Sequence, residues 1–231
     1  MTSSPPARSD TTGDCWFRLP PGYLDIDLDG LEGLRERLLT MPSLFALAPA
    51  DWDRHRHATE ALLQLLEEGL GQGLMYAALG LHMQDSAETC VSVLTLSDVD
   101  SGAPTPSAAA AQCGLHMVTR SMGTVQQGRF VDLPCASPAA LSTALLPVPS
   151  DAVMASTGLP KVNREVFHAR LTIARPHGPR VVIIDLTTTA VSVAEDYTDI
   201  LLGVGRTISF VDPASPPRDQ GRPSRLLELF T

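Results

Sequence analysis

The stretch from Phe167 to Val211 constrains the fold of this chain most. Residues 167–175 and 180–189 are rich in β-branched and apolar side chains, which predicts two strands. Pro176-His-Gly-Pro179 lies between them and is a turn signal, because proline restricts φ and glycine accepts positive φ. A helical period follows the second strand. This order predicts an antiparallel hairpin with a helix beside it, and the stretch contains no catalytic motif.

The size and composition of the chain suit one globular domain. It has 231 residues, of which 44% are hydrophobic, so a sizeable core is available and global disorder is excluded. The formal net charge is −9, and the basic residues are scattered without a stripe. Such a charge argues against a nucleic-acid or anionic-membrane surface. We therefore expect neither nucleic acid nor a lipid surface as the partner.

No segment of the sequence predicts export or membrane insertion. No apolar run reaches the roughly 18 residues that a membrane-spanning helix needs. The first ten residues lack the apolar core of a signal peptide. Cysteines 15, 90, 113 and 135 are far apart and unpatterned, which favours free thiols over a disulfide framework. These features predict a cytoplasmic protein.

Composition divides the chain into a central domain and two tails. Residues 1–14 are rich in Ser, Thr, Pro and Asp, and we expect a disordered N-terminal tail. Residues 15–212 form a single α+β domain in this interpretation. Residues 213–231 are rich in Pro, Ser and Arg and are expected to be a flexible tail. The apolar cluster from Leu226 to Phe230 makes the end of that tail a candidate docking peptide.

Hydrophobic periodicity places the other elements. The expected helices are 31–41, 51–70, 107–120 (capped near Thr105 or Ser107) and 193–204. The expected strands are a short one after Cys15, then 24–28, 74–83, 89–96, 122–126, 129–133, 141–148, 167–175, 180–189 and 206–211, with a loop over 97–106 and a turn at Gln127-Gly128.

Two of these strands carry specific burial predictions. In the strand 24–28, alternation places Leu24, Ile26 and Leu28 inside and the intervening Asp25 and Asp27, with Asp29, outside. Gly80 marks a bulge or a close contact in the strand 74–83. The core of the domain is expected to centre on the C-terminal unit, at Leu171, Ile173, Val181, Ile183, Leu201 and Ile208.

The order of elements resembles the Mog1/PsbP-like superfamily, in which helices cover both faces of a mainly antiparallel sheet. The resemblance rests on Phe17-Arg-Leu-Pro-Pro-Gly-Tyr-Leu-Asp-Ile26, which is similar to that group's opening strand and Pro-Gly turn. It also rests on Tyr197-Thr-Asp-Ile-Leu-Leu-Gly-Val-Gly-Arg-Thr-Ile-Ser-Phe210, which resembles its closing helix and strand. The middle of the chain, about 98–160, is longer than the superfamily pattern. The whole chain also resembles actinobacterial proteins of this size, some of them encoded near type VII secretion genes.

The resemblance implies an α/β/α sandwich and a function without catalysis. Members of the superfamily are mostly adaptors, secretion chaperones and photosystem subunits. The implied partner is another protein, either a secretion-system component or a secreted substrate, or a second copy of the chain. No cofactor and no metal is implied.

The histidines and aspartates do not form a recognisable metal site. His55 and His57, at i and i+2 on a helix, point in opposite directions and cannot share a metal as an i, i+4 pair could. The other histidines, 82, 116, 168 and 177, are isolated in the sequence. Asp25, Asp27 and Asp29 lack the glycine-containing loop of a calcium site, as do Asp98 and Asp100. Solvated positions explain these residues better.

Nucleophile and phosphate-binding motifs are also missing. The segments Ser121-Met-Gly123 and Ser156-Thr-Gly158 do not match a nucleophile elbow. Gly69-Leu-Gly-Gln-Gly73 and Gly203-Val-Gly205 follow helices, whereas a phosphate loop precedes one. Thr187-Thr-Thr189 and Cys135 would matter only if the fold placed them in a cleft.

Two functions therefore remain open from the sequence. The favoured one is a non-catalytic, protein-binding adaptor or secretion-chaperone-like module, with no catalytic, cofactor-binding or metal-binding residues assigned. The alternative is a hydrolase with a dispersed Ser/His/Asp or thiol site, such as Cys135 with His168. A deep cleft with convergent His, Asp or Cys side chains would favour the enzyme, and an apolar patch or groove the adaptor.

Overall fold

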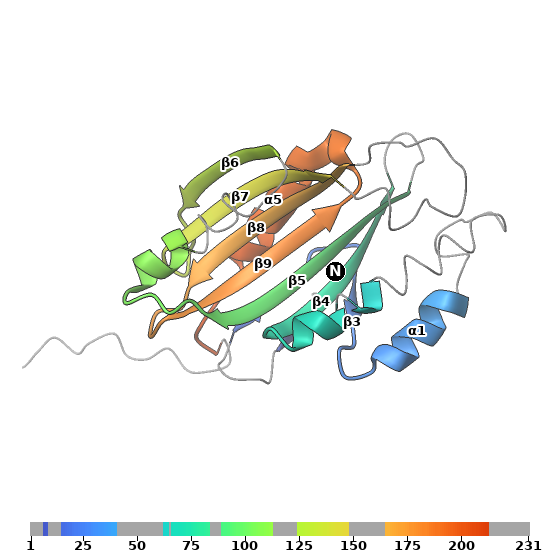
Figure 1. The fold of residues 1–231 in the computed structure, drawn as a ribbon, viewed down its shortest axis with the longest axis horizontal. Helices are drawn as coiled ribbons and strands as arrows, with labels where there is room; N and C mark the ends of the chain where they lie inside the picture. The colour runs from blue at the N-terminus through green and yellow to red at the C-terminus, as the bar shows by residue number, and fades with distance from the viewer. Residues whose placement is uncertain are drawn as a thin grey trace, which may run out of the picture.

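An antiparallel sheet runs through the middle of the molecule (Figure 1). The structure is a computed structural model and describes residues 7–8, 15–40, 62–64, 66–83, 89–112, 124–147 and 165–212. Within these residues the sheet has seven strands in the order β3-β4-β5-β9-β8-β7-β6. Their bounds are Tyr23–Ile26 (β3), Leu74–Met83 (β4), Thr89–Asp100 (β5), Thr124–Val131 (β6), Ala139–Pro147 (β7), Glu165–Ala174 (β8) and Arg180–Thr188 (β9).

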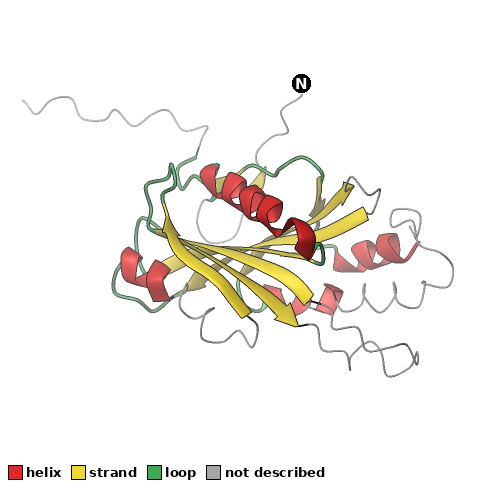
Figure 2. Cartoon of the chain, turned by 90° about the horizontal axis from the view of Figure 1, so that it is seen from above, coloured by secondary structure: helices red, strands yellow, loops and turns green. Residues whose placement is uncertain are grey.

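Helices cover both faces of this sheet, which confirms the predicted α+β class. Helix α5 (Ala194–Arg206), preceded by the 3₁₀ turn η3 (Val191–Val193), packs on β8 and β9. Helix α1 (Leu31–Thr40) and the helical residues 66–70 cover the opposite face at β3 and β4. Figure 2 shows α5 against one side of the sheet and the other helical segments toward the opposite side. Among the described residues, no helix is long and apolar enough to cross a membrane.

The predicted hairpin of β8 and β9 is present, and it lies in the centre of the sheet. Its register pairs Ala174 with Val181 and Phe167 with Thr188, and the turn 175–180 closes with a backbone hydrogen bond of 3.0 Å from Arg175 N to Arg180 O. Strands β7 and β5 flank the hairpin on either side. The expected hairpin of β4 and β5 is also present.

The main core lies between the sheet and α5. It contains fully buried residues of the hairpin, Leu171, Ile173, Val182, Ile184 and Leu186, together with Leu201 of α5. The register of β9 differs by one residue from the prediction, because Val181 and Ile183 point to the opposite face. There Val181 is buried against Ala103 and Ala109, and Ile183 is only half-buried.

Close approach between α5 and the sheet depends on a glycine. A Cβ at Gly205 would lie 2.3 Å from Leu171 Cδ2, so any other residue would require the buried leucine side chain or the helix to shift. Gly203 and Gly205 thus lie inside α5 rather than at its exit. The helix ends at Thr207, whose hydroxyl donates to Val204 O over 2.7 Å.

The first strand of the sheet follows the predicted alternation except at Leu24, since Ile26 is buried, Leu28 is half-buried beside it, and the three aspartates at 25, 27 and 29 are exposed. Leu24 is 54% exposed, Tyr23 is buried in the α5-side core, and Ile26 is buried on the other side. Tyr23 pairs with Gly80, where a Cβ would meet the tyrosine ring at 2.8 Å. The close contact predicted at Gly80 therefore exists, and it directs the tyrosine rather than the leucine inward.

Three other segments differ from the predictions. Strand β5 continues to Asp100 and so includes the first four residues of the expected loop 97–106. Residues 124–131 form one strand, in which a bulge between Val125 and Gln127 replaces the expected turn. The expected strand 206–211 is reduced to a single bridge between Ser209 and Trp16, since α5 extends to Arg206.

The ends and the remaining helices are described in part. Trp16–Phe17 (β2) pairs with Ala7–Arg8 (β1), which lies within the expected N-terminal tail. Of the expected helix 51–70, residues 62–64 and 66–70 are helical, and the rest lies outside the described residues. Residues 106–112 are helical, and the Thr105 side chain caps them by accepting from Ala108 N at 3.2 Å, as predicted. The tail 213–231 lies outside the described residues.

The register of β9 makes a testable difference between two neighbouring isoleucines. Ile184→Ala should lower the free energy of unfolding by about 2–5 kcal/mol, because it leaves a cavity in the main core. Ile183→Ala is the matched control and should cost less, since that side chain is half-buried. Urea denaturation measures both values. A larger loss for Ile183→Ala would contradict the register.

Candidate functional site

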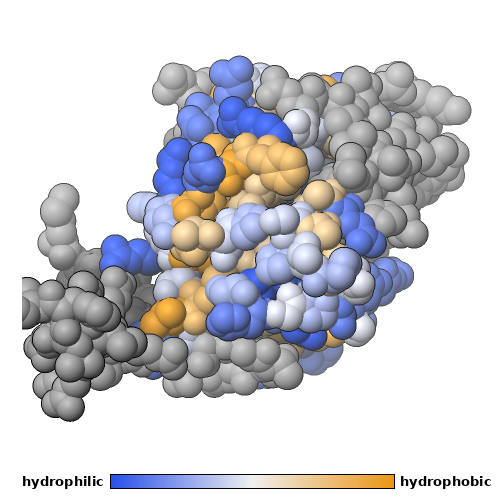
Figure 3. Space-filling model, turned by 90° about the vertical axis from the view of Figure 1, so that its left-hand side faces the viewer, coloured by the Kyte–Doolittle hydropathy of each residue, from blue (hydrophilic) through white to orange (hydrophobic). Residues whose placement is uncertain are grey.

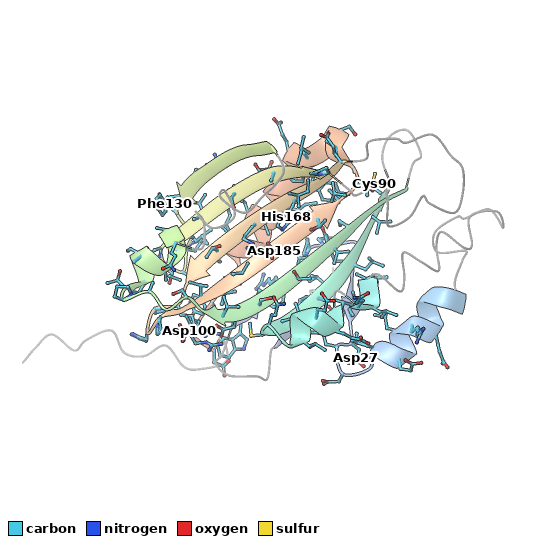
Figure 4. The ribbon with its side chains drawn as sticks, viewed as in Figure 1. Asp27, Cys90, Asp100, Phe130, His168 and Asp185 are labelled. Atoms are coloured by element: carbon cyan, nitrogen blue, oxygen red, sulfur yellow. The ribbon has the colours of Figure 1, made fainter. Side chains whose placement is uncertain are left out.

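A polar cluster lies in the middle of the sheet face that α5 does not cover. Arg170 of β8 is paired with Asp185 of β9, and two hydrogen bonds join them, Nε to Oδ1 at 2.6 Å and Nη2 to Oδ2 at 2.8 Å. His168 Nε2 lies 3.0 Å from the same Oδ1 (Figure 4). The Asp185 carboxylate therefore contacts two groups of β8, the guanidinium of Arg170 and the imidazole of His168.

These contacts keep the Asp185 carboxylate ionised. Burial by itself raises the pKa of Asp185, but the hydrogen bond with His168 and the charge and hydrogen bonds of Arg170 outweigh it and hold the pKa at about 2. With both oxygens occupied, the carboxylate does not serve as a proton acceptor near neutral pH. The arrangement is that of a structural ion pair which aligns β8 with β9.

The structure does not bring Cys135 and His168 together. Cys135 follows β6 and packs against the core on the α5 side of the sheet. His168 points to the opposite face, where it contacts Asp185. Because the sheet lies between the two side chains, they do not form a thiol-imidazole pair. Thr187 is paired with His168, whereas Thr188 faces the α5 side and donates to Val91 O at 2.8 Å.

The other histidines and the cysteines do not converge on a site either. His177 is exposed in the turn between β8 and β9, and His82 lies on β4. Cys15, Cys90 and Cys135 are free thiols, and burial raises the pKa of Cys15 to about 12, so this thiol stays protonated. The remaining candidates lie outside the described residues: His55, His57, His116, Cys113, Ser121-Met-Gly123 and Ser156-Thr-Gly158.

The aspartates singled out in the sequence have separate structural partners. The Tyr76 hydroxyl donates to Asp25, and Asp27 Oδ1 accepts from Asp29 N at 3.2 Å. Asp98 is buried between two arginines, with Arg175 Nη2 2.6 Å from Oδ2 and Arg180 Nε 2.9 Å from Oδ1.

Asp100 Oδ1 accepts from the backbone N of Gly102 at 2.8 Å, which stabilises the turn after β5. In the described part of the chain, no group of three His, Cys, Asp or Glu side chains is placed to hold a metal ion. The glycine-rich segment 69–73 connects a helix to β4, and Gly73 has φ +91°, as in a helix C-terminal turn.

A groove lies on the other face, between α5 and the edge of the sheet. Its volume is about 300 Å³, and its floor is formed by Leu141 of β7 and Phe167 of β8, which are both buried and expose little apolar surface. Helix α5 packs on β8 and β9, so β6 and β7 extend past it and leave this space open. The lining residues are Arg129, Leu141, Thr143, Phe167, Ala194, Glu195, Thr198 and Asp199.

The two walls of the groove carry opposite charges. Arg129 projects from the β6 wall, whereas Glu195 and Asp199, one helical turn apart, project from the α5 wall. All three side chains are exposed. Within the described residues, Arg129 forms no ion pair with either carboxylate. The groove thus places a free cation opposite two free anions.

The strand that forms the outer wall is also the edge of the sheet. Among the described strands, β6 pairs only with β7, and Phe130 on it is 70% exposed. A second cavity of about 320 Å³ lies where β6 ends, between Phe130, Leu133 and Pro138. In Figure 3, which faces this end of the molecule, apolar side chains form a band among hydrophilic ones. Sequence reasoning missed the groove, since its walls are far apart in the chain.

The Asp185 cluster predicts a specific acid dependence of stability. The folded-state pKa of about 2 is below the ordinary value of 3.8, so the folded protein binds fewer protons between these values. The contribution, about 2 kcal/mol, is fully present above pH 4 to 5 and is lost as the pH falls toward 2. Asp185→Asn should flatten this part of the profile, measured by denaturation at several pH values. An unchanged slope would show that the ion pair does not form.

Comparisons with known proteins identify no family for this chain. No protein-family model and no curated protein sequence matches it. Among solved structures, the chain is similar to LpqN of Mycobacterium tuberculosis, described as involved in cell envelope biogenesis. The identity is 9%, the alignment covers 89% of this chain and 88% of LpqN, and the TM-score is 0.46. This likeness is too loose to assign a family or a function.

Proposed function

We propose that the chain is a non-catalytic protein-binding module that holds a segment of a partner protein in the groove between α5 and β6–β7. The observation that carries the proposal is the pair of oppositely charged walls, whose charges form no ion pair within the described residues. Charged side chains without partners at a cleft are suited to orient a ligand. A peptide segment has both apolar and charged side chains, so it can contact the floor and both walls of the groove.

The position of the groove favours a peptide over a small metabolite. The groove opens beside an edge strand, where an extended or helical segment can lie along the sheet without displacing an element. Its volume is at the lower end of the range for small-molecule sites. A segment that enters the groove would contact the floor, and the rest of it would lie over β6.

The placement of the reactive side chains supports a role without catalysis. The Asp185 carboxylate is bound by Arg170 and His168, and the Cys135 thiol lies across the sheet from His168. His168 contacts a carboxylate rather than a hydroxyl or a thiol. The chemistry of a nucleophile with an adjacent base therefore has no support from this geometry.

The more specific role that we propose for the module follows from its sequence resemblance to the Mog1/PsbP-like superfamily. A Mog1/PsbP-like module would act as an adaptor or as a secretion-chaperone-like protein. Its partner would be a secretion-system component, a secreted substrate or a second copy of the chain. A cytoplasmic location belongs to the same proposal.

Charge reversal on the β6 wall tests this function. Arg129→Glu should reduce recovery of the partner about tenfold, because a lost charge pair costs about 1.4 kcal/mol. The measurement is capture from the native host with quantitative mass spectrometry. Arg18→Glu, an exposed arginine away from the groove, is the matched control and should leave recovery unchanged.

Two results would contradict the proposal. Equal recovery with Arg129→Glu and Arg18→Glu would move the binding surface away from the groove. Hydrolysis of generic esters by the wild-type chain, abolished by Cys135→Ala or His168→Ala, would replace the adaptor with an enzyme.

A further inference from the structure

We infer that the groove recognises an extended segment of the partner protein in which two basic residues flank an acidic one, as in Lys-Glu-Lys. The inference rests on the proposed function, since it names the chemistry of the partner at the same site. Three observations carry it. They are the order of the charges on the two walls, the spacing of the charges along α5 and the polar character of the lining.

The two walls of the groove require opposite charges from a segment that lies between them. Arg129 lies on the β6 wall, and Glu195 and Asp199 lie on the α5 wall. All three side chains are exposed, and none of them forms an ion pair in the part of the chain that the structure describes. A complementary segment presents cations on one side and an anion on the other. Adjacent residues of an extended chain point to opposite sides, so alternating basic and acidic residues meet this requirement.

The spacing of the two carboxylates selects the number of basic residues. Glu195 and Asp199 are four residues apart on α5, which separates them by about 6 Å along the helix axis. In an extended chain, residues i and i+2 point to the same side and are about 7 Å apart. Two basic residues separated by one residue therefore meet both carboxylates, and the residue between them points to Arg129. The net charge of the chain, −9, favours the same basic character in the partner.

The lining of the groove favours an extended segment over a helix. A helix that docks in a groove buries an apolar stripe, but the floor residues Leu141 and Phe167 are buried and expose little apolar surface. Thr143 and Thr198 also line the groove. The Thr198 hydroxyl donates to Ala194 O at 3.0 Å, so its lone pairs remain available to accept a backbone N–H of the segment. An extended chain has such N–H groups free, whereas a helix uses them internally.

The selectivity of such a groove comes from the set of charges rather than from one strong contact. Exposed ion pairs contribute little one at a time, so a peptide that loses one of the three pairs should bind about fivefold more weakly. Reversal of a wall charge removes a pair and also adds a repulsion, so its effect should be about tenfold.

Two peptides of identical composition test the alternation of charges. They are fluorescein-labelled Thr-Lys-Glu-Lys-Thr and Thr-Lys-Lys-Glu-Thr, both with blocked ends. In any register of an extended chain the second peptide keeps at most two of the three pairs, so the wild-type chain should bind it about fivefold more weakly. Fluorescence polarisation at low ionic strength measures both affinities. This comparison needs no substitution in the protein.

Charge variants of the full-length chain test the two walls. Asp199→Lys should weaken binding of the Lys-Glu-Lys peptide about tenfold. Asp196→Lys is the matched control, because Asp196 is exposed on the same helical turn, undergoes the same change of charge and does not line the groove. The triple variant Arg129→Glu/Glu195→Lys/Asp199→Lys should bind Thr-Glu-Lys-Glu-Thr more tightly than the Lys-Glu-Lys peptide, which is the reverse of the wild-type order.

Each outcome of these titrations decides the inference. Equal affinity of the wild-type chain for the two peptides of identical composition would overturn it, and so would the absence of binding at millimolar protein. Equal weakening by Asp196→Lys and Asp199→Lys would assign the effect to net charge rather than to the groove, as would an unchanged preference in the triple variant. If the peptides fail these tests but partner capture still depends on Arg129, only this inference fails and the proposed function stands.

Discussion

The register between β8 and β9 is the constraint on which the rest of the structure depends. It places Ile184 and Leu186 under α5 and, on the other face, sets Asp185 opposite Arg170. A slip by one residue would move the carboxylate into the α5-side core and expose the isoleucine. The bidentate ion pair and the apolar core therefore select the same register. Helix α5 then lies over β8 and β9, and the space beside it becomes the groove.

The sequence predicted the positions of the strands more reliably than it predicted which of their side chains point into the main core. The tight turn at 176–179 and the β-branched run after it predicted the hairpin correctly, because turn chemistry is local. The inward face of β9 was wrong because residues 181–184 are all apolar and the strand is buried on both sides, which removes the alternation signal. At Leu24 the pattern was present but misleading, since a contact with distant Gly80 directs Tyr23 inward instead. Local periodicity contains no information about such contacts.

The candidate site was less accessible to sequence reasoning than the fold. His168 was noted with Cys135 as the partner considered, whereas the hairpin register brings Asp185 to His168 and Arg170 to the same carboxylate. A charged residue in the middle of the most apolar strand was the signal that could have found this cluster. For the groove no such signal exists. Its walls are Arg129 and the acidic first turns of α5, and its presence depends on how far the helix covers the sheet.

The charges that remain unpaired distinguish the groove from the other polar regions of the molecule. Asp98 is held by two arginines, and Asp185 by an arginine and a histidine, so each of these carboxylates is paired within the fold. Arg129, Glu195 and Asp199 face one another across the groove without such pairing in the described residues. The α5 wall is anchored to the core, whereas among the described strands the β6 wall is held by β7 alone.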